Sequence, residues 1–540
     1  MEKLPKELRP EQYHSLAEVL EYAAANHGPL PAFTGFGHSL DYRRIDELSS
    51  RLAGFLRNNL KLQAGDRIAV QLPNVLQFPV AVYAAIKADL VIVTTNPLYT
   101  APEMRHQFED SGAKAVIILE AFCDKLEDVI GETAIDHVII ARPGDLLPGL
   151  RGRLVDLAAK HLRKMVPEYS LPGAHAFHEA VQAGPFAAAA QRGGGDTALI
   201  LYTGGTTGVA KGAMLSHDNL IANMMQLRSR TLLVIEDQSA KVVAPLPLYH
   251  TYAFQLHLLV MAYAGSHNIL VPNPRDIGGL VKLLRRHKVH GFTGINTLYL
   301  ALLRHPGLRR VNFKSWRFCG AGGMAMSSSV AEEWLERTGC EILEGYGLTE
   351  CSPTVAVNLP GRARRGTVGQ AVPETELRVI DDLGNALPAG AVGELQVRGP
   401  QVMAGYYGRE EATAECIDPQ GWFSTGDYAT ISEDGYISIV DRKKDMILVS
   451  GFNVFPNEVE DWVNRHPQVA ESAAIGVPDE RTGEAVKLFL VPRGGAPDAD
   501  VIRDWCRQGL AAYKIPRQIE NVKDLPKSNI GKILRRELRE

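Results

Sequence analysis

Short apolar runs separated by a longer one characterise the first part of the chain. Residues 66–74 and 113–120 are short apolar runs, and residues 78–97 hold a long apolar run that ends in another short one. Short runs bounded by turn residues predict buried strands, and the long run predicts a helix. This order of strand, helix and strand predicts doubly wound α/β layers with a largely parallel sheet.

The pattern changes further along the chain. Residues 375–399 alternate between apolar and polar positions between Gly and Pro turns, which predicts a small antiparallel sheet or barrel. A compact α+β tail of about a hundred residues follows, which is a normal domain size. We therefore expect an α/β fold: a large N-terminal domain of doubly wound layers with a small β-barrel-like subdomain, and a small α+β C-terminal domain.

Length, net charge and cysteine spacing argue against several classes of protein and site. A chain of 540 residues is too long for one ordinary domain, and its net charge of −4 offers no attractive field for nucleic acid. The six cysteines are scattered without a CxxC pair, which argues against a zinc site or a disulfide framework and fits a reducing compartment. The charged first residues do not resemble a signal peptide. Gly265 and polar neighbours interrupt the longest apolar stretch, residues 256–271, so we expect no membrane-spanning helix.

The segment from Tyr202 to Lys211 carries the most informative chemistry. Gly and Thr alternate directly after an apolar run, which predicts a strand that ends in a tight loop. Glycines allow close backbone approach, hydroxyls donate hydrogen bonds and a lysine adds positive charge, so the loop suits a polyphosphate. The residues concerned are Thr203, Gly204, Gly205, Thr206, Thr207, Gly208 and Lys211. Two residues separate Gly208 from the lysine, so this is not a Walker A loop, and the alternative is a Gly-rich turn without a ligand.

Further motifs follow along the chain. They are GAGG (320–323), EGYGLTE (344–350), STGD (424–427), DRKKD (441–445), SGFNVFPNEVE (450–460) and PKSNIGKILRREL (526–538). In this order and spacing the chain resembles the adenylate-forming superfamily of acyl-CoA synthetases, luciferases and peptide-synthetase adenylation domains, from about residue 40 to its end. Residues 420–447 and 245–259 resemble, more narrowly, the fatty acyl-CoA synthetases of bacteria, with medium- and long-chain substrates.

That resemblance implies a two-step reaction. A fatty acid and ATP form an acyl-adenylate with loss of pyrophosphate, and the thiol of CoA then displaces AMP. The loop from Thr203 to Lys211 is implied to hold the β- and γ-phosphates, and Glu350, assisted by Thr203, to bind Mg²⁺. Tyr346 is implied to stack on adenine. Asp427, supported by Arg442, is implied to accept hydrogen bonds from the ribose.

Other residues gain expected roles from the same resemblance. Lys532 is implied to contact the α-phosphate and the acyl oxygen. His250 is implied to lie in the catalytic site beside the acyl group and the pantetheine path, although not as a general base. Lys444 and Gly451 are expected near CoA. The remaining nucleotide-binding positions are Gly320, Ala321, Gly322, Glu344, Gly345, Gly347 and Thr349. Taken singly, Asp427 would be an ordinary turn residue and Lys532 a solvated surface lysine.

The domain boundary also follows from the resemblance. It places residues 1–440 in an adenylation domain with the ATP and acyl sites, and residues 441–540 in a mobile C-terminal domain. Rotation about Asp441 would exchange Lys532 for the Gly451 loop between the two half-reactions, since hinges are a few residues at the ends of elements.

Two segments are candidates for contact with the acyl chain or with a membrane. Residues 249–261 are largely apolar and contain no acidic residue, and with residues 320–324 they would enclose the acyl group, although such spacings are usually core. Residues 150–166 predict a basic amphipathic helix that can lie on an anionic membrane. A helix docked on the core is the alternative that we favour.

Two other functions stay open. One is an acyl-AMP ligase that loads a carrier protein, or a peptide-synthetase adenylation domain, although residues 249–261 lack an acid for a substrate amine. The other is a catalytically silent sensor of acyl groups and nucleotides. The expected small-molecule substrates are a fatty acid, ATP and CoA, without nucleic acid. We expect a cytoplasmic protein, with peripheral contact to the inner face of the membrane and a homodimer left open.

Overall fold

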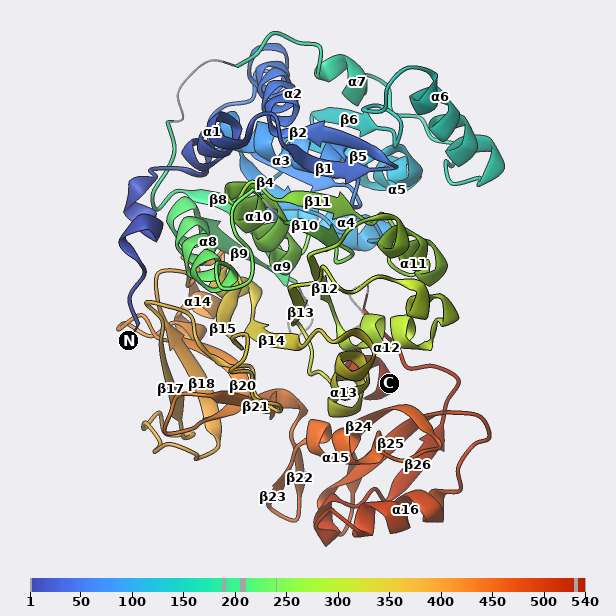
Figure 1. The fold of residues 1–540 in the computed structure, drawn as a ribbon. Coiled ribbons are helices and arrows are strands. Elements are labelled where there is room, and N and C mark those ends of the chain that lie inside the picture. The colour runs from blue at the N-terminus through green and yellow to red at the C-terminus, as the bar shows by residue number, and fades with distance from the viewer. Residues whose placement is uncertain (1, 187–190, 204–209, 239, 529–532, 540) are drawn as a thin grey trace.

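The protein folds into a large N-terminal domain and a small C-terminal domain (Figure 1). The computed structural model describes residues 2–186, 191–203, 210–238, 240–528 and 533–539. Two large mixed sheets form the N-terminal domain, and a four-stranded sheet is attached to it. The expected α/β fold class is confirmed.

The first large sheet has eight strands. In spatial order they are β19 (Gly405–Tyr406), β9 (Lys211–Ser216), β8 (Thr197–Thr203), β4 (Val91–Thr94), β3 (Arg67–Gln71), β5 (Ala115–Leu119), β6 (His137–Ala141) and β7 (His175–Ala176). The strands from β8 to β7 are parallel, and β9 runs antiparallel to both β8 and β19. The strand, helix and strand predicted between residues 66 and 120 are therefore confirmed.

The long apolar run between these strands forms helix α3 (Gln77–Lys87). Every residue from Gln77 to Ile86 is buried. A helix that is apolar on all faces must be enclosed by other elements, and α3 packs against α2 (Tyr42–Gly54) and beside β3 and β4. Lys87 at its end keeps its charge paired, since its Nζ lies 2.6 Å from an oxygen of Asp46.

The second large sheet has nine strands. In spatial order they are β16 (Gln370–Ala371), β15 (Thr354–Val357), β14 (Ile342–Gly347), β13 (Phe318–Ala321), β12 (Gly291–Gly294), β10 (Lys241–Ala244), β11 (His267–Leu270), β1 (Pro31–Gly35) and β2 (His38–Asp41). The strands from β14 to β1 are parallel, so the C-terminal ends of β13 and β14 lie at the same edge of the sheet.

Helices cover these two sheets. They are α1 (Leu16–His27), α4 (Ala101–Ser111), α5 (Cys123–Ile130), α6 (Leu150–Leu157), α7 (Phe177–Ala180), α8 (His217–Thr231), α9 (Thr251–Ala253), the π-helical η6 (Phe254–Val260), α10 (Met261–Tyr263), α11 (Ile277–Arg286), α12 (Asn296–Arg304), α13 (Ser328–Thr338) and α14 (Glu410–Cys416). No helix among the described residues is long and apolar enough to cross a membrane.

The alternating segment forms an antiparallel sheet, as predicted. The segment supplies β17 (Glu376–Ile380) and β18 (Gly393–Arg398), and β20 (Phe423–Ile431) and β21 (Ile437–Arg442) complete the four-stranded sheet. Apolar residues of the four strands form a small core together with Ala356 of β15. Strand β21 then leads the chain out of the N-terminal domain.

The C-terminal domain contains a mixed five-stranded sheet and three helices, seen in orange and red in Figure 1. The elements are β22 (Ile447–Val449), β23 (Phe452–Val454), α15 (Pro456–Val463), β24 (Val469–Asp479), β25 (Gly483–Pro492), α16 (Ala499–Arg507), β26 (Gln518–Asn521) and α17 (Arg535–Arg539). It buries a separate apolar cluster, and α15 packs beside β21. The exact boundary at Asp441 and the mobility of this domain stay predictions.

Candidate active site

Strands β8 and β9 form a hairpin that holds the two ends of the predicted phosphate loop. Thr203 pairs with Lys211, and the Thr203 hydroxyl donates to the Lys211 carbonyl oxygen at 3.5 Å. The loop residues Gly204, Gly205, Thr206, Thr207 and Gly208 lie outside the described residues, as does Lys532. The hairpin geometry therefore brings a threonine hydroxyl and a lysine together at one strand end.

Tyr406 connects this hairpin to Glu350. It lies on β19, beside β9, and its ring centroid is 5.4 Å from the Lys211 Nζ. Its hydroxyl donates to the Glu350 Oε1 at 2.9 Å. Burial, together with the Glu350 charge, raises the pKa of Tyr406 well above its usual value, so the hydroxyl stays protonated and keeps donating. The Lys211 ammonium, the Tyr406 ring and the Glu350 carboxylate therefore lie next to one another in that order.

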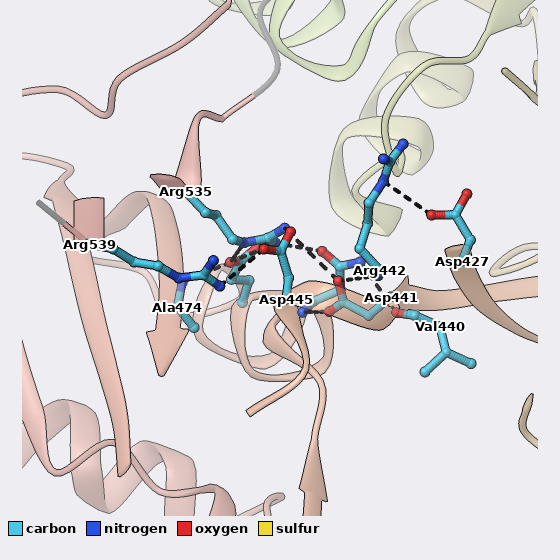
Figure 2. Close-up of polar contacts among 10 residues, drawn as sticks. Asp427, Val440, Asp441, Arg442, Asp445, Ala474, Arg535 and Arg539 are labelled. Atoms are coloured by element: carbon cyan, nitrogen blue, oxygen red, sulfur yellow. Dashed lines mark hydrogen bonds and ion pairs between the residues drawn. The ribbon is translucent and has the colours of Figure 1, made fainter. Parts of the chain in front are cut away.

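Asp427 is the centre of a second group. It is only 4 % exposed and lies on β20, opposite Arg442 on β21. Its Oδ1 is 3.1 Å from the Arg442 Nε, and its Oδ2 accepts a hydrogen bond from the Tyr346 hydroxyl at 2.5 Å. Figure 2 shows the Arg442 side chain extended toward Asp427. Burial, reinforced by the Asp427 charge, raises the pKa of Tyr346. The carboxylate that we expect at the ribose is therefore held from two sides.

The ends of β13 and β14 present closely packed backbone. Ala321 pairs with Glu344, and a Cβ added at Gly322 would lie 3.3 Å from the Gly345 carbonyl oxygen. A Cβ added at Gly347 would lie 2.2 Å from the Pro353 carbonyl oxygen, so this position excludes any side chain. The GAGG and EGYG backbones therefore lie side by side, and their role in nucleotide binding stays a prediction.

Glu344, at the start of the EGYG segment, has a raised pKa. Burial raises its pKa to about 7, and Asp461 of the C-terminal domain adds to the effect.

His250, Thr349 and Gly320 each lie next to a residue of α9. His250 caps α9, where its Nδ1 accepts the Tyr252 backbone N–H at 3.3 Å. The Thr349 hydroxyl lies 2.9 Å from the Thr251 hydroxyl. A Cβ added at Gly320 would be 3.2 Å from the Tyr252 hydroxyl oxygen. This contact joins segments 249–261 and 320–324 as expected, while the acyl pocket itself stays a prediction.

The expected CoA residues lie in two exposed turns that follow β21. Lys444 is exposed on the short turn after β21, and Gly451 is exposed between β22 and β23 with a φ of +83°. Among the hydrogen bonds and ion pairs of the described residues, none joins either residue to Glu350 or Asp427.

Sequence reasoning did not identify Tyr406 or Thr251 as parts of the site. Tyr406 stands between Gly405 and Gly408, both with positive φ, in a segment that reads as a turn. Its importance depends on the pairing of β19 with β9, which joins residues almost two hundred positions apart. Only the glycine-flanked tyrosine pair Tyr406 and Tyr407 could have drawn attention to it.

The basic amphipathic segment begins with a helix that docks on the N-terminal domain. Helix α6 is followed by a π-helical turn, Ala158–Leu162, and it docks through Gly152 and Asp156. The Asp156 carboxylate accepts the Gly144 backbone N–H at 2.8 Å, and Gly152 is packed so closely that a Cβ would meet the Gly144 carbonyl oxygen at 2.5 Å. The helix is therefore docked on the domain, as we expected, while its large apolar side chains point away from the core.

Comparison with known proteins gives a consistent result. Models of the AMP-binding enzyme family and of the AMP-binding enzyme C-terminal domain match residues 20–407 and 458–532. The long-chain-fatty-acid–CoA ligase of Salmonella typhimurium is 46% identical over 99% of this chain and 96% of its own length. The anthranilate CoA ligase AuaEII, solved with anthranoyl-AMP, has a TM-score of 0.88 at 25% identity, covering 98% of each chain. ATP-bound MatB from Rhodopseudomonas palustris has a TM-score of 0.84 at 29% identity, covering 97% of this chain and 98% of that one.

Proposed function

Because the chain belongs to the AMP-binding enzyme family, we infer that it is an ATP-dependent fatty-acid–CoA ligase. It activates a fatty acid as the acyl-adenylate and transfers the acyl group to CoA, and the products are acyl-CoA, AMP and pyrophosphate. The observation that carries this function is the identity to a long-chain-fatty-acid–CoA ligase over nearly the whole of both chains.

In the first half-reaction, a carboxylate oxygen of the fatty acid forms a bond to the α-phosphorus, and the bond to pyrophosphate breaks. We assign the ribose hydroxyls to Asp427, since Tyr346 and Arg442 already fix its carboxylate. We assign the outer phosphates to the loop that ends at Lys211. Groups fixed before the substrate arrives stabilise the transition state without reorganising. In the second half-reaction, the CoA sulfur bonds to the acyl carbon and AMP leaves.

The residues present also fit a magnesium ion carried mainly by phosphates. Glu350 uses Oε1 for the Tyr406 hydroxyl, and no hydrogen bond described here uses Oε2. Within the described ranges no three His, Cys, Asp or Glu side chains gather as a metal site. Mg²⁺ in nucleotide sites takes one or two carboxylates plus phosphate oxygens. Glu350 and Thr203 would hold it, and it would neutralise phosphate charge there.

Acyl-CoA formation is expected to require the fatty acid, ATP, Mg²⁺ and CoA together. AMP, pyrophosphate and acyl-CoA should appear in equal amounts, because each turnover breaks one bond in ATP and makes one thioester. The three products can be measured in one reaction series from which each component is omitted in turn. CoA consumption without AMP would contradict the function. Transfer to a phosphopantetheine carrier but not to CoA would indicate the carrier-loading ligase, and an absence of turnover would indicate the sensor.

We further propose that the enzyme works in the cytoplasm and binds to the face of the membrane. The binding surface would be the outer side of α6 and the turn after it. Five large apolar side chains there are more than half exposed: Leu150, Leu154, Leu157, Leu162 and Met165, at 72%, 65%, 53%, 82% and 51%. An apolar patch of this kind on the surface is typical of an interaction site. Phe36 extends it, since the Arg151 guanidinium donates to the Phe36 carbonyl oxygen at 2.5 Å.

Charge favours an anionic lipid surface as the occupant. Exposed basic residues flank the apolar patch: Arg151, Arg153, Lys160, Arg163 and Lys164. The acidic residue of the helix, Asp156, points inward to the Gly144 turn. Apolar burial together with basic residues near anionic headgroups is how an interfacial helix binds. The proposed substrate also partitions into membranes, so this surface would place the enzyme at its source.

Replacing Leu150 and Leu154 by Gln is expected to weaken binding to phosphatidylglycerol vesicles by roughly tenfold or more, because each buried leucine contributes about 1.5 kcal/mol or more. Co-sedimentation at low and high salt measures the binding, and Leu383→Gln, at an even more exposed leucine far along the chain, is the control. Binding of the wild type to vesicles made only of neutral phosphatidylcholine would contradict the charge argument. Light scattering that finds a dimer dispersed by the double variant would assign the patch to a second copy.

A further inference from the structure

The last helix, α17, is fastened to the junction of the two domains by Arg535. The Arg535 guanidinium contacts carboxylates from three elements: the end of β21, the turn after it and α15. Figure 2 shows it beside Asp441 and Asp445. Its Nη2 lies 2.9 Å from the Glu460 Oε2, and its Nη1 lies 3.6 Å from Asp445 and 4.0 Å from Asp441. Arg539 adds a contact of 3.0 Å to Asp445.

This cluster is buried, so its charges depend on one another. The Arg535 side chain is 12% exposed, Glu460 10% and Asp445 11%, and Asp441 is not exposed at all. Removing one partner from a buried ion pair leaves the other charge uncompensated, which costs far more than an exposed pair contributes. Arg535 is thus the cation that faces Asp441 and Glu460, and it shares Asp445 with Arg539.

A continuous path leads from this cluster to the nucleotide site. Asp441 accepts the backbone N–H of Arg442 and of Asn457, each at 2.8 Å. The Asn457 side chain accepts a hydrogen bond from Arg535 at 2.8 Å and donates to the Val440 carbonyl oxygen at 3.3 Å. The backbone on both sides of Asp441 is therefore fixed by groups that Arg535 orients. The next residue, Arg442, pairs with Asp427.

We propose that Arg535 is a positioning residue for the nucleotide site: it fixes Asp441 and Asn457, and through them the backbone from which Arg442 reaches Asp427. The proposal rests on the proposed function, because it takes Asp427 as the ribose contact. Arg535 itself does not touch the reacting atoms. Its loss should impair the use of ATP more than the use of a preformed acyl-adenylate.

Replacing Arg535 by Met tests the proposal. We expect the rate of fatty-acid-dependent exchange between ATP and pyrophosphate to fall between about 10- and 100-fold, with a raised KM for ATP, since small misplacements of binding groups have effects of this size. The KM for the fatty acid should stay within about twofold. Arg535→Lys should recover part of the loss. Arg536→Met is the matched control, because Arg536 is the exposed neighbour without an ion pair among the described contacts.

The pH dependence gives a readout that mere loss of stability would not move. Burial raises the pKa of Asp441 to about 6, and the Arg535 charge opposes this rise. The other groups facing Asp441 are the N–H groups of Arg442 and Asn457 and the acids Glu460 and Asp461. Asp441 is ionised above its pKa, so its ion pair weakens as the pH falls through about 6. Without Arg535 that pKa rises further, and the acid limb of the exchange profile should move to higher pH.

The outcomes separate the two claims. If wild-type protein lacks fatty-acid-dependent exchange, the proposed function fails before the variant is considered. If the wild type is active and Arg535→Met keeps its KM for ATP and its pH profile, the positioning role is wrong. A variant that melts at a lower temperature and loses both half-reactions equally would also contradict the positioning role, because general destabilisation gives that pattern.

Discussion

Replacing Lys532 by alanine is expected to slow acyl-adenylate formation by roughly 10²–10³-fold, because removing one charged donor from a developing oxyanion costs about 3–4 kcal/mol of barrier. Lys532 lies outside the described residues, and its assignment to the α-phosphate comes from the PKSNIGK motif. Thioester formation from supplied acyl-adenylate should be nearly unaffected, since no phosphate is displaced by the carboxylate in that step. Exchange between ATP and pyrophosphate measures the first half-reaction, and rapid mixing of acyl-adenylate with CoA measures the second.

Lys523→Ala provides the control for this substitution. Lys523 is an exposed lysine of the same C-terminal segment, and no contact of its side chain is described. It should leave both half-reactions unchanged. Equal losses in both half-reactions for Lys532→Ala would show that this lysine is not specific to adenylation.

Catalytic efficiency is expected to rise steeply with the length of the acyl chain. Each methylene that leaves water contributes about 0.8 kcal/mol, which is roughly fourfold in kcat/KM, until the pocket is full. From butyrate to decanoate, six methylenes would then give roughly three and a half orders of magnitude. Measuring kcat/KM for saturated acids from C2 to C18 tests this. A maximum at C2 to C4 would overturn both the fatty-acid assignment and the placement of the pocket at residues 249–261.

A matched pair of substrates separates chain length from head-group recognition. Octanoate and 2-aminooctanoate have the same chain, and only the second carries an amine. The segment from Tyr249 to Met261 contains no acidic residue that would pair with that amine. We expect octanoate to be strongly preferred, and equal use of the two acids would favour an adenylation domain for amino acids.

The sequence predicted the elements whose residues carry a local pattern. The apolar run that forms α3 is uniform over ten buried positions, so burial on all faces could be inferred directly. The alternation in residues 375–399 predicted the pairing of β17 with β18, because side-chain period and turn residues agree there. Asp427 and Arg442 could be named from motifs that stand close together in the chain, and they do pair.

Contacts between distant segments could not be predicted in the same way. Tyr406 joins Lys211 and Glu350 only because β19 adds to the edge of β9, and nothing near Tyr406 in the sequence encodes that pairing. Periodicity in α6 showed which residues share a face, but not which face docks. Gly152 and Asp156 decide this, because a missing side chain and a carboxylate fit the Gly144 turn and the leucines do not.

The Arg535 cluster also constrains how this chain can change in evolution. Asp441, Glu460 and Arg535 come from three separate stretches of sequence. In the fold, the Arg535 cation compensates the buried negative charges of the two acids. A substitution at one of them leaves an unpaired charge, so a lineage that changes one should change another at nearly the same time, or keep all three. An alignment of relatives should therefore show these positions varying as a set, with Arg536, one residue away and exposed, drifting on its own.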